Sequence, residues 1–108
     1  MTNQLRNATF SPKTIAVGAA TTANSSGVYV VNGAYTLTLG SGLVVGDIVV
    51  VYNNHSADIT IEDGPFTDFH ADNDTAPNTD YQLATHAMAT ITIISSTTAV
   101  IAGAGVST

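Results

Sequence analysis

The segment from residue 66 to residue 80 holds most of the side chains that could do chemistry. Its ionisable groups are Asp68, His70, Asp72, Asp74 and Asp80, with Asn73 and Asn78 as further oxygen donors. Calcium takes six to eight oxygen ligands, and an acidic loop can supply them. However, the spacing lacks the alternating Asp order and the closing Glu of an EF-hand loop. A cluster of this kind is more often a hydrated surface whose Asp and Asn side chains cap their own turns. We therefore expect no metal or cofactor, and keep a calcium loop of Asp68, Asp72, Asp74 and Asp80 as a minor alternative.

The three histidines do not combine with their neighbours into a catalytic set. His55 lies beside Ser56 and Asp58, but residues this close within one turn cannot take the three-way geometry of a Ser-His-Asp system. No Gly-x-Ser-x-Gly elbow accompanies them. Zinc is disfavoured because the chain has no cysteine and because His70 and His86 lie far apart. We expect a protein that is not an enzyme and has no catalytic residues.

Charge is sparse and unevenly placed along the chain. There are two basic and eight acidic residues, for a formal net charge of −6. Arg6 and Lys13 are the basic residues, and every acid falls at Asp47 or later. Nucleic acids and anionic membranes bind clustered Lys and Arg, so we expect neither as a partner. Tyrosines beside acids could bind a sugar, but aromatic side chains serve mainly in cores and interfaces.

The elements that position these residues are predicted to be strands, organised around residues 48–52. This run reads Ile-Val-Val-Val-Tyr. Branched side chains favour an extended backbone, and the run is too short for a typical helix. Because it contains no polar residue, it predicts a central strand covered on both faces. On that interpretation Val50→Asp would bury an unpaired charge and unfold the chain.

Short alternating segments flank this strand on both sides. Strands are predicted at 13–17, 28–31, 34–39, 57–62, 81–84, 87–94 and 98–102. Asn32-Gly33 is typical of a two-residue hairpin, and residues 53–56 have the length of another hairpin connection. Residues 66–80 are expected to be irregular, and no stretch shows a helical period. The pattern predicts one all-β domain over 13–108, an antiparallel β-sandwich or jelly-roll-like barrel, with an extended N-terminal arm over 1–12.

An ordered set of motifs over residues 28–106 resembles small bacteriophage virion proteins that act as capsid decoration (cement) proteins or as fibre modules. The matching pieces are Gly46-Asp47-Ile48-Val49-Val50-Val51-Tyr52-Asn53-Asn54, Ile59-Thr60-Ile61, Ala89-Thr90-Ile91-Thr92-Ile93 and Val100-Ile101-Ala102-Gly103-Ala104-Gly105-Val106. The arm lies outside the resemblance. The acidic loop at 66–80 departs from it, being longer and more charged than the family pattern.

The resemblance implies a virion structural protein that binds the outer capsid surface and stabilises it. Its partners would be the major capsid protein and further copies of itself, as a homotrimer. The arm could dock on the coat or on the next protomer through Leu5, Arg6, Phe10 and Lys13. The N-terminus lacks an apolar core of signal-peptide length, and no segment approaches the ~20 apolar residues of a membrane helix. We expect synthesis in the host bacterial cytoplasm and a final location on the capsid surface of the virion.

Two alternatives stay open at this point. One is a fibre or spike module that binds a host glycan. Such a module more often belongs to a longer chain with a coiled-coil shaft, whereas this chain begins with Met1 and has no heptads, which favours decoration. The other is a calcium- or sugar-binding domain unrelated to phage.

Overall fold

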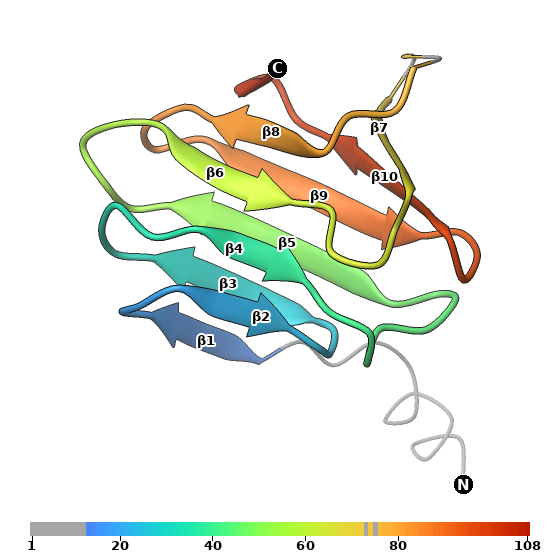
Figure 1. The fold of residues 1–108 in the computed structure, drawn as a ribbon. Coiled ribbons are helices and arrows are strands. Elements are labelled where there is room, and N and C mark those ends of the chain that lie inside the picture. Colours follow the sequence, from blue (N-terminus) through green and yellow to red (C-terminus); the bar gives the residue numbers. More distant parts are fainter. Residues whose placement is uncertain (1–12, 73, 75) are drawn as a thin grey trace, which may run out of the picture.

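The computed structural model describes residues 13–72, 74 and 76–108, which form two packed β-sheets (Figure 1). The strands are β1 (Thr14–Val17), β2 (Thr21–Ala23), β3 (Gly27–Val31), β4 (Leu37–Leu39), β5 (Ile48–Asn53), β6 (Ile59–Glu62), β7 (Asp68–Ala71), β8 (Asp80–Leu83), β9 (Met88–Ile93), β10 (Thr98–Ala102) and β11 (Val106–Ser107). The six-stranded sheet has the order β1-β3-β5-β9-β10-β7, and the five-stranded sheet has the order β11-β8-β6-β4-β2. The predicted all-β sandwich is confirmed. Among the described segments there is no helix long and apolar enough to cross a membrane.

From β1 to β6 the chain alternates between the two sheets. The strands β1, β3 and β5 lie parallel in the six-stranded sheet, and β2, β4 and β6 lie parallel in the five-stranded sheet. This half therefore stacks as three flattened turns of a solenoid. The strands β8 and β9 then pair antiparallel with β6 and β5, and β10 pairs antiparallel with β9. At the far edge β7 joins β10 in parallel.

The sheets are thus mixed and not purely antiparallel, and both predicted hairpins are wrong. The segment after Asn32-Gly33 leads from β3 in one sheet to β4 in the other, and residues 54–58 likewise carry the chain from β5 to β6. The turn chemistry correctly indicates a change of direction. It does not specify whether the next strand pairs with the last one or crosses to the opposite layer, because that depends on core packing.

The segment 66–80 is also more ordered than predicted, since it contains β7. Phe69 of β7 is fully buried, and Phe66 just before the strand is 1% exposed. The ring of Phe69 meets the ring of Tyr81 edge to face, with centroids 5.0 Å apart. The strand is short and has one buried aromatic, Phe69, between Asp68 and His70, so it produces no clear alternating pattern in the sequence.

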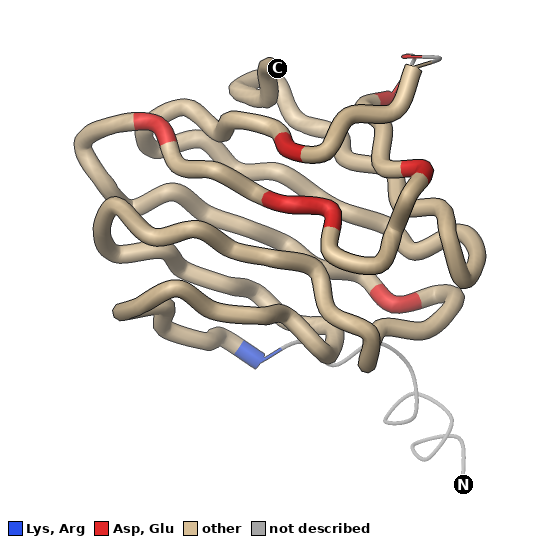
Figure 2. The backbone as a smooth tube through the Cα atoms, viewed as in Figure 1, with Lys and Arg blue, Asp and Glu red and all other residues tan. Residues whose placement is uncertain are grey.

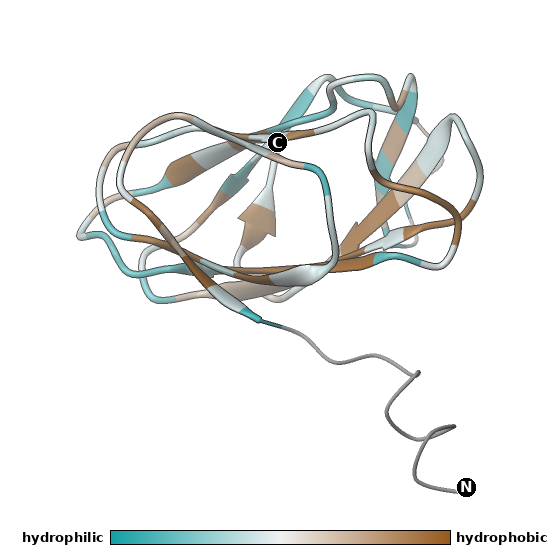
Figure 3. Cartoon of the chain, turned by 90° about the horizontal axis from the view of Figure 1, so that it is seen from below, coloured by the Kyte–Doolittle hydropathy of each residue, from teal (hydrophilic) through white to brown (hydrophobic). Residues whose placement is uncertain are grey.

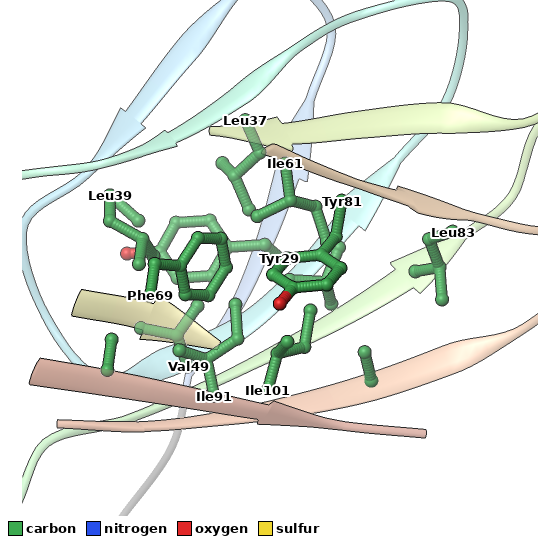
Figure 4. Close-up of a cluster of buried hydrophobic side chains, with 14 of the residues drawn as sticks. Tyr29, Leu37, Leu39, Val49, Ile61, Phe69, Tyr81, Leu83, Ile91 and Ile101 are labelled. Carbon is green, nitrogen blue, oxygen red and sulfur yellow. The ribbon is translucent and has the colours of Figure 1, made fainter. Parts of the chain in front are cut away.

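The two sheets form separate layers when seen from below (Figure 3), and the hydrophobic core lies between them (Figure 4). Each strand contributes alternate side chains to it. Its largest fully buried members are Tyr81, Phe66, Phe69, Leu37, Leu39, Ile61, Leu83, Ile91, Ile93 and Ile101. Burying an aromatic or Leu side chain contributes about 1.5–3 kcal/mol, so these few residues supply much of the favourable burial term.

The strand β5 lies in the interior of its sheet, between β3 and β9, as predicted. Val49 and Val51 point into the core and are fully buried, whereas Ile48, Val50 and Tyr52 point outward and are only half-buried. The expectation that both faces of this strand are covered is wrong for the described part of the chain. Successive side chains of a strand point to opposite faces, and only one face of this sheet has a second layer.

Candidate functional site

The outer surface of the six-stranded sheet is the most unusual feature of the molecule. We call the outward side chains of β3, β5, β9 and β10 the apolar face: Val28, Val30, Ile48, Val50, Tyr52, Met88, Thr90, Thr92, Thr98, Val100 and Ala102. These four strands contain no charged residue. When water covers one side of a sheet, that side normally carries polar residues, which alternate along each strand with the apolar residues of the buried side. The apolar face therefore has the composition of a surface that is covered by another layer.

The strand registers arrange these residues in rows, because residues that pair directly across strands point to the same side. Three rows run across the sheet: Ala16, Val30, Tyr52 and Met88; Thr14, Val28, Val50, Thr90 and Ala102; Ile48, Thr92, Val100 and His70. Val50 lies in the middle row on one of the two central strands. The face is thus continuous and broad, with valine and threonine at its centre.

Exposed apolar side chains extend this face at both ends. Val44, Val45 and Ile94 are 63%, 65% and 52% exposed at one end, and Met88 is 55% exposed at the other. The amide of Gly46 donates to the carbonyl of Ile93 at 2.9 Å, which places the 44–46 turn beside Ile94. Contiguous apolar patches of this kind on a soluble domain commonly mark an interaction surface.

The turn that presents Val44 and Val45 is held in place by Asp47. One carboxylate oxygen of Asp47 accepts a hydrogen bond from the amide of Val44 at 2.9 Å, and the other accepts one from the Ser26 hydroxyl at 2.9 Å. The Ser26 hydroxyl oxygen in turn accepts from the amide of Ile48 at 3.0 Å. The two valines are therefore exposed on an anchored turn.

The outer surface of the five-stranded sheet is polar by contrast. It carries Thr22, Thr38, Thr60, Glu62, Asp80 and Gln82, and the acidic segments gather over β6, β8 and the connecting loops (Figure 2). Glu62 and Asp80 are direct cross-strand partners. Partial burial raises the pKa of the neighbouring Asp63 carboxyl, and the charges of Glu62 and Asp80 raise it further. Four acids, Asp58, Glu62, Asp63 and Asp80, therefore lie on or beside β6 and β8 on this side of the sandwich.

Only the margins of the apolar face carry charge within the described residues. Lys13 is exposed immediately before β1, at one edge of the six-stranded sheet. Asp68 and the exposed Asp72 lie on and just after β7, at the opposite edge. The face is therefore uncharged between a basic edge and an acidic edge.

The structure does not bring the four proposed calcium ligands together. Asp68 and Asp80 belong to different sheets. A carboxylate oxygen of Asp68 accepts from the Thr98 hydroxyl at 3.2 Å, and a carboxylate oxygen of Asp74 accepts from the Ala76 amide at 3.1 Å. Within residues 13–72, 74 and 76–108, no three His, Asp or Glu side chains are grouped so as to hold a metal ion. Asp74 therefore caps its own turn, and Asp68 connects β7 to β10.

The histidines are dispersed over the described surface. His86 has a positive φ of 58°, and its ring stacks on Tyr52 with centroids 6.4 Å apart. The Tyr52 hydroxyl lies 3.3 Å from Nδ1 of His86. Sequence reasoning missed this pair because the two residues are far apart in the chain. It lies at the rim of the apolar face and is open to solvent.

A depression lies at the end of β7 and β10, at the margin of the apolar face. It has a volume of about 370 Å³ and is lined by Ala71, Asp72, Ile101, Ala102, Gly103, Ala104 and Val106. Asp72 is the one ionisable side chain in that lining. Nucleophilic or acid–base catalysis needs a set of groups in mutual reach. This lining supplies a single carboxylate, so the depression is not a developed active site.

The arm residues Leu5, Arg6 and Phe10 lie outside the described part of the chain, so their predicted contacts stay predictions. Comparison of the sequence with protein-family models gives no match, and comparison with curated proteins gives none either. The candidate site is therefore defined by its geometry alone, as an uncharged sheet surface suited to contact with another protein.

Proposed function

We propose that this chain is a bacteriophage virion structural protein, and specifically a capsid decoration protein. In this role it binds the outer surface formed by the major capsid protein and stabilises the assembled coat. The observation that supports a role in protein–protein contact is the broad apolar face on the outer surface of the six-stranded sheet. The virion context comes from the resemblance of residues 28–106 to phage decoration and fibre proteins.

The stabilising effect would follow from mass action. A protein that binds the assembled coat and not its separated subunits shifts the equilibrium toward assembly, in proportion to the logarithm of its concentration over Kd. Docking is proposed through the basic arm, with Leu5, Arg6, Phe10 and Lys13 as contacts. Lys13 is exposed beside β1 and accessible to an acidic patch on the coat. The acidic five-stranded sheet would then face solvent.

A fibre or spike module that binds a host glycan is the second candidate. The stacked and exposed Tyr52–His86 pair favours it, because aromatic rings offer an apolar face combined with a polar group. A glycan array separates the two functions. Strong binding to one sugar that is lost in Tyr52→Ala would support recognition of the host over cementing.

The direct experiment is co-sedimentation of the purified chain with capsids of its own phage that lack it. We expect saturable binding and a higher temperature of capsid disruption. Lys13→Glu should weaken binding, whereas Thr60→Asp on the opposite sheet should not. Absence of binding at micromolar concentration would contradict the decoration proposal. The trimer implied by the resemblance stays a prediction, and the mass of the free protein tests it.

A further inference from the structure

We propose that the apolar face binds the apolar face of a second copy of this chain, so that two six-stranded sheets stack in a two-fold pair. This inference goes beyond the virion proposal and does not depend on it. It assigns the apolar face to contact between copies, leaves docking on the coat to the arm, and predicts two copies where the resemblance implies three. It rests on the composition of the face, on the location of the charges and on the direction of the edge strands.

The charge distribution selects the surface through which two copies can approach. Each copy has a net charge of −6. The outer surface of the five-stranded sheet carries Glu62 and Asp80, so contact through that surface would oppose like charges. Contact through β3, β5, β9 and β10 opposes no charges at all. Unpaired like charges in an interface are unfavourable, whereas apolar sheet surfaces pack about 10 Å apart with interdigitating side chains.

The edges of the face also determine how the two copies are oriented. The strands β1 and β7 run in the same direction. β1, β3 and β5 are parallel to one another. β9 runs opposite to both β5 and β10, so β10 is parallel to β5, and β7 is parallel to β10. A two-fold axis along the strands, between β5 and β9, places the β1 edge of each copy over the β7 edge of the other.

This orientation brings opposite charges together twice. Thr14, which follows Lys13, lies in the same row as Ala102 of β10. Asp72 lies close to that row as well, because its amide donates to the carbonyl of Ile101 at 2.8 Å. Lys13 and Asp72 therefore lie at a similar height along the strands, on opposite edges. In the pair, the start of β1 with the exposed Lys13 lies over the end of β7 with the exposed Asp72 of the other copy. An axis across the strands through the middle row would instead stack each edge on itself, and place Asp72 near Asp72 and Lys13 near Lys13.

The stacked sheets offer a contact of moderate size. With strands about 4.8 Å apart and about 3.3 Å per residue, the six-stranded sheet covers on the order of 450 Å² in projection. The exposed Val44, Val45 and Ile94 extend it. This area lies below the ~800 Å² per partner of a standard protein interface, in the range of weak, reversible association.

The first test is the mass of the chain in solution, measured by light scattering during size exclusion. We expect two copies at micromolar concentration. Val50→Asp should weaken the pair at least ~100-fold, because a carboxylate would be buried without a partner. Thr60→Asp is the matched control on the outer surface of the five-stranded sheet, where its carboxylate can still accept from Gln82, and it should leave the pair intact. Circular dichroism must show that both variants are folded.

The second test uses the absence of cysteine from the chain. In the pair, Val50 of one copy lies opposite Thr90 of the other, at a sheet spacing of about 10 Å that is too long for a disulfide. Mixed Val50→Cys and Thr90→Cys chains should therefore be joined by a short bismaleimide. Thr60→Cys chains should not be joined.

A charge exchange tests the orientation. Lys13→Glu should weaken the pair, and Asp72→Lys in the same chain should restore it. A monomer at 100 µM, three copies per particle, or a pair that survives Val50→Asp would each overturn the proposal. Failure of the double variant to recover would overturn the orientation. A pair that forms while the chain does not bind capsids would instead overturn the proposed function and leave this inference standing.

Discussion

At the scale of single residues, Asn53 at the end of β5 connects three segments of the chain. It is the one fully buried polar side chain in the described core. Its side-chain nitrogen donates to the carbonyls of Ala57 at 2.8 Å and Leu83 at 2.9 Å, and its side-chain oxygen accepts from the amide of His55 at 2.9 Å. Both polar atoms of the side-chain amide are therefore hydrogen-bonded. The bond to Leu83 of β8 connects Asn53 of the six-stranded sheet to the five-stranded sheet.

We predict that Asn53→Ala lowers the free energy of unfolding by about 2–4 kcal/mol, because buried carbonyls and an amide lose their partners. Asn54→Ala is the control, since Asn54 is exposed and its side chain bonds to the exposed Asn32 side chain, whereas its backbone bond to Val31 does not involve the side chain. That variant should change stability by less than about 0.5 kcal/mol. Urea unfolding at fixed protein concentration measures both. Equal stability of the two variants would contradict the structural role of Asn53.

Gly64 is a second position where one residue determines the path of the chain. It has a φ of +56°, and a Cβ added there would lie 1.8 Å from the carbonyl oxygen of Leu39. The turn between β6 and β7 can therefore approach β4 only because the side chain is absent. Backbone atoms of β4 cannot move aside without breaking the sheet.

We predict that Gly64→Ala destabilises the fold by about 3 kcal/mol or more, as expected for a steric clash combined with an unfavourable φ. Gly18→Ala is the control, because its added Cβ would meet nothing within 4 Å and its φ is not positive. The thermal midpoints of the two variants compare them directly. A Gly64→Ala protein as stable as the parent would mean that this turn takes another path.

At the scale of elements, β5 shows how one apolar run serves two different surfaces. Its inward residues form the core and its outward residues form the apolar face. The Ile-Val-Val-Val-Tyr run predicted a strand with apolar residues on both of its faces, and the structure confirms this strand. The inference that both sides are buried in one chain failed, because a composition suited to burial does not say whether the covering layer comes from the same chain.

We predict opposite outcomes for the same substitution at adjacent residues of β5. Val51→Asp should unfold the chain, because Val51 is fully buried and an isolated carboxylate there costs several kcal/mol. Val50→Asp should fold and remain soluble, since Val50 points outward and is half-buried. Circular dichroism and thermal melting distinguish them. A folded Val51→Asp protein would show that the register of β5 is wrong by one residue.

The strand positions could be predicted because alternation along a strand is a local property of the backbone. The pairing of the strands could not. Asn32-Gly33 is typical of a hairpin, yet β3 pairs with β1 and β5 while β4 pairs with β2 and β6. The crossing buries Leu37 and Leu39 against the opposite layer. That packing involves residues far apart in the sequence, so no local motif reports it.

At the scale of the whole molecule, the sandwich has two chemically different outer surfaces. Acids lie on the five-stranded sheet and the loops, and the six-stranded sheet is uncharged between Lys13 and the β7 edge. This division separates a surface suited to water from a surface suited to protein contact. The uncharged surface exists only in the folded chain, because residues from β3, β5, β9 and β10 become neighbours when the sheet forms.

We predict that the thermal midpoint rises with protein concentration. Association of the folded state stabilises it by mass action, so a change from 1 to 100 µM should raise the midpoint by a few degrees. The Val50→Asp chain should melt at a temperature that does not depend on concentration. Differential scanning calorimetry over this range measures both. A concentration-independent midpoint for the parent chain would contradict pairing.

Propensity and the two-residue period of the backbone are enough to predict that the chain is all-β, where its main strands lie and that its central strand lacks polar residues. They do not predict which sheet each strand joins, that β7 exists, or that one side of β5 is left open. Those outcomes depend on which distant side chains fill the core together. The apolar face arises from the same cause, because its rows are set by pairings between strands that are remote in the sequence.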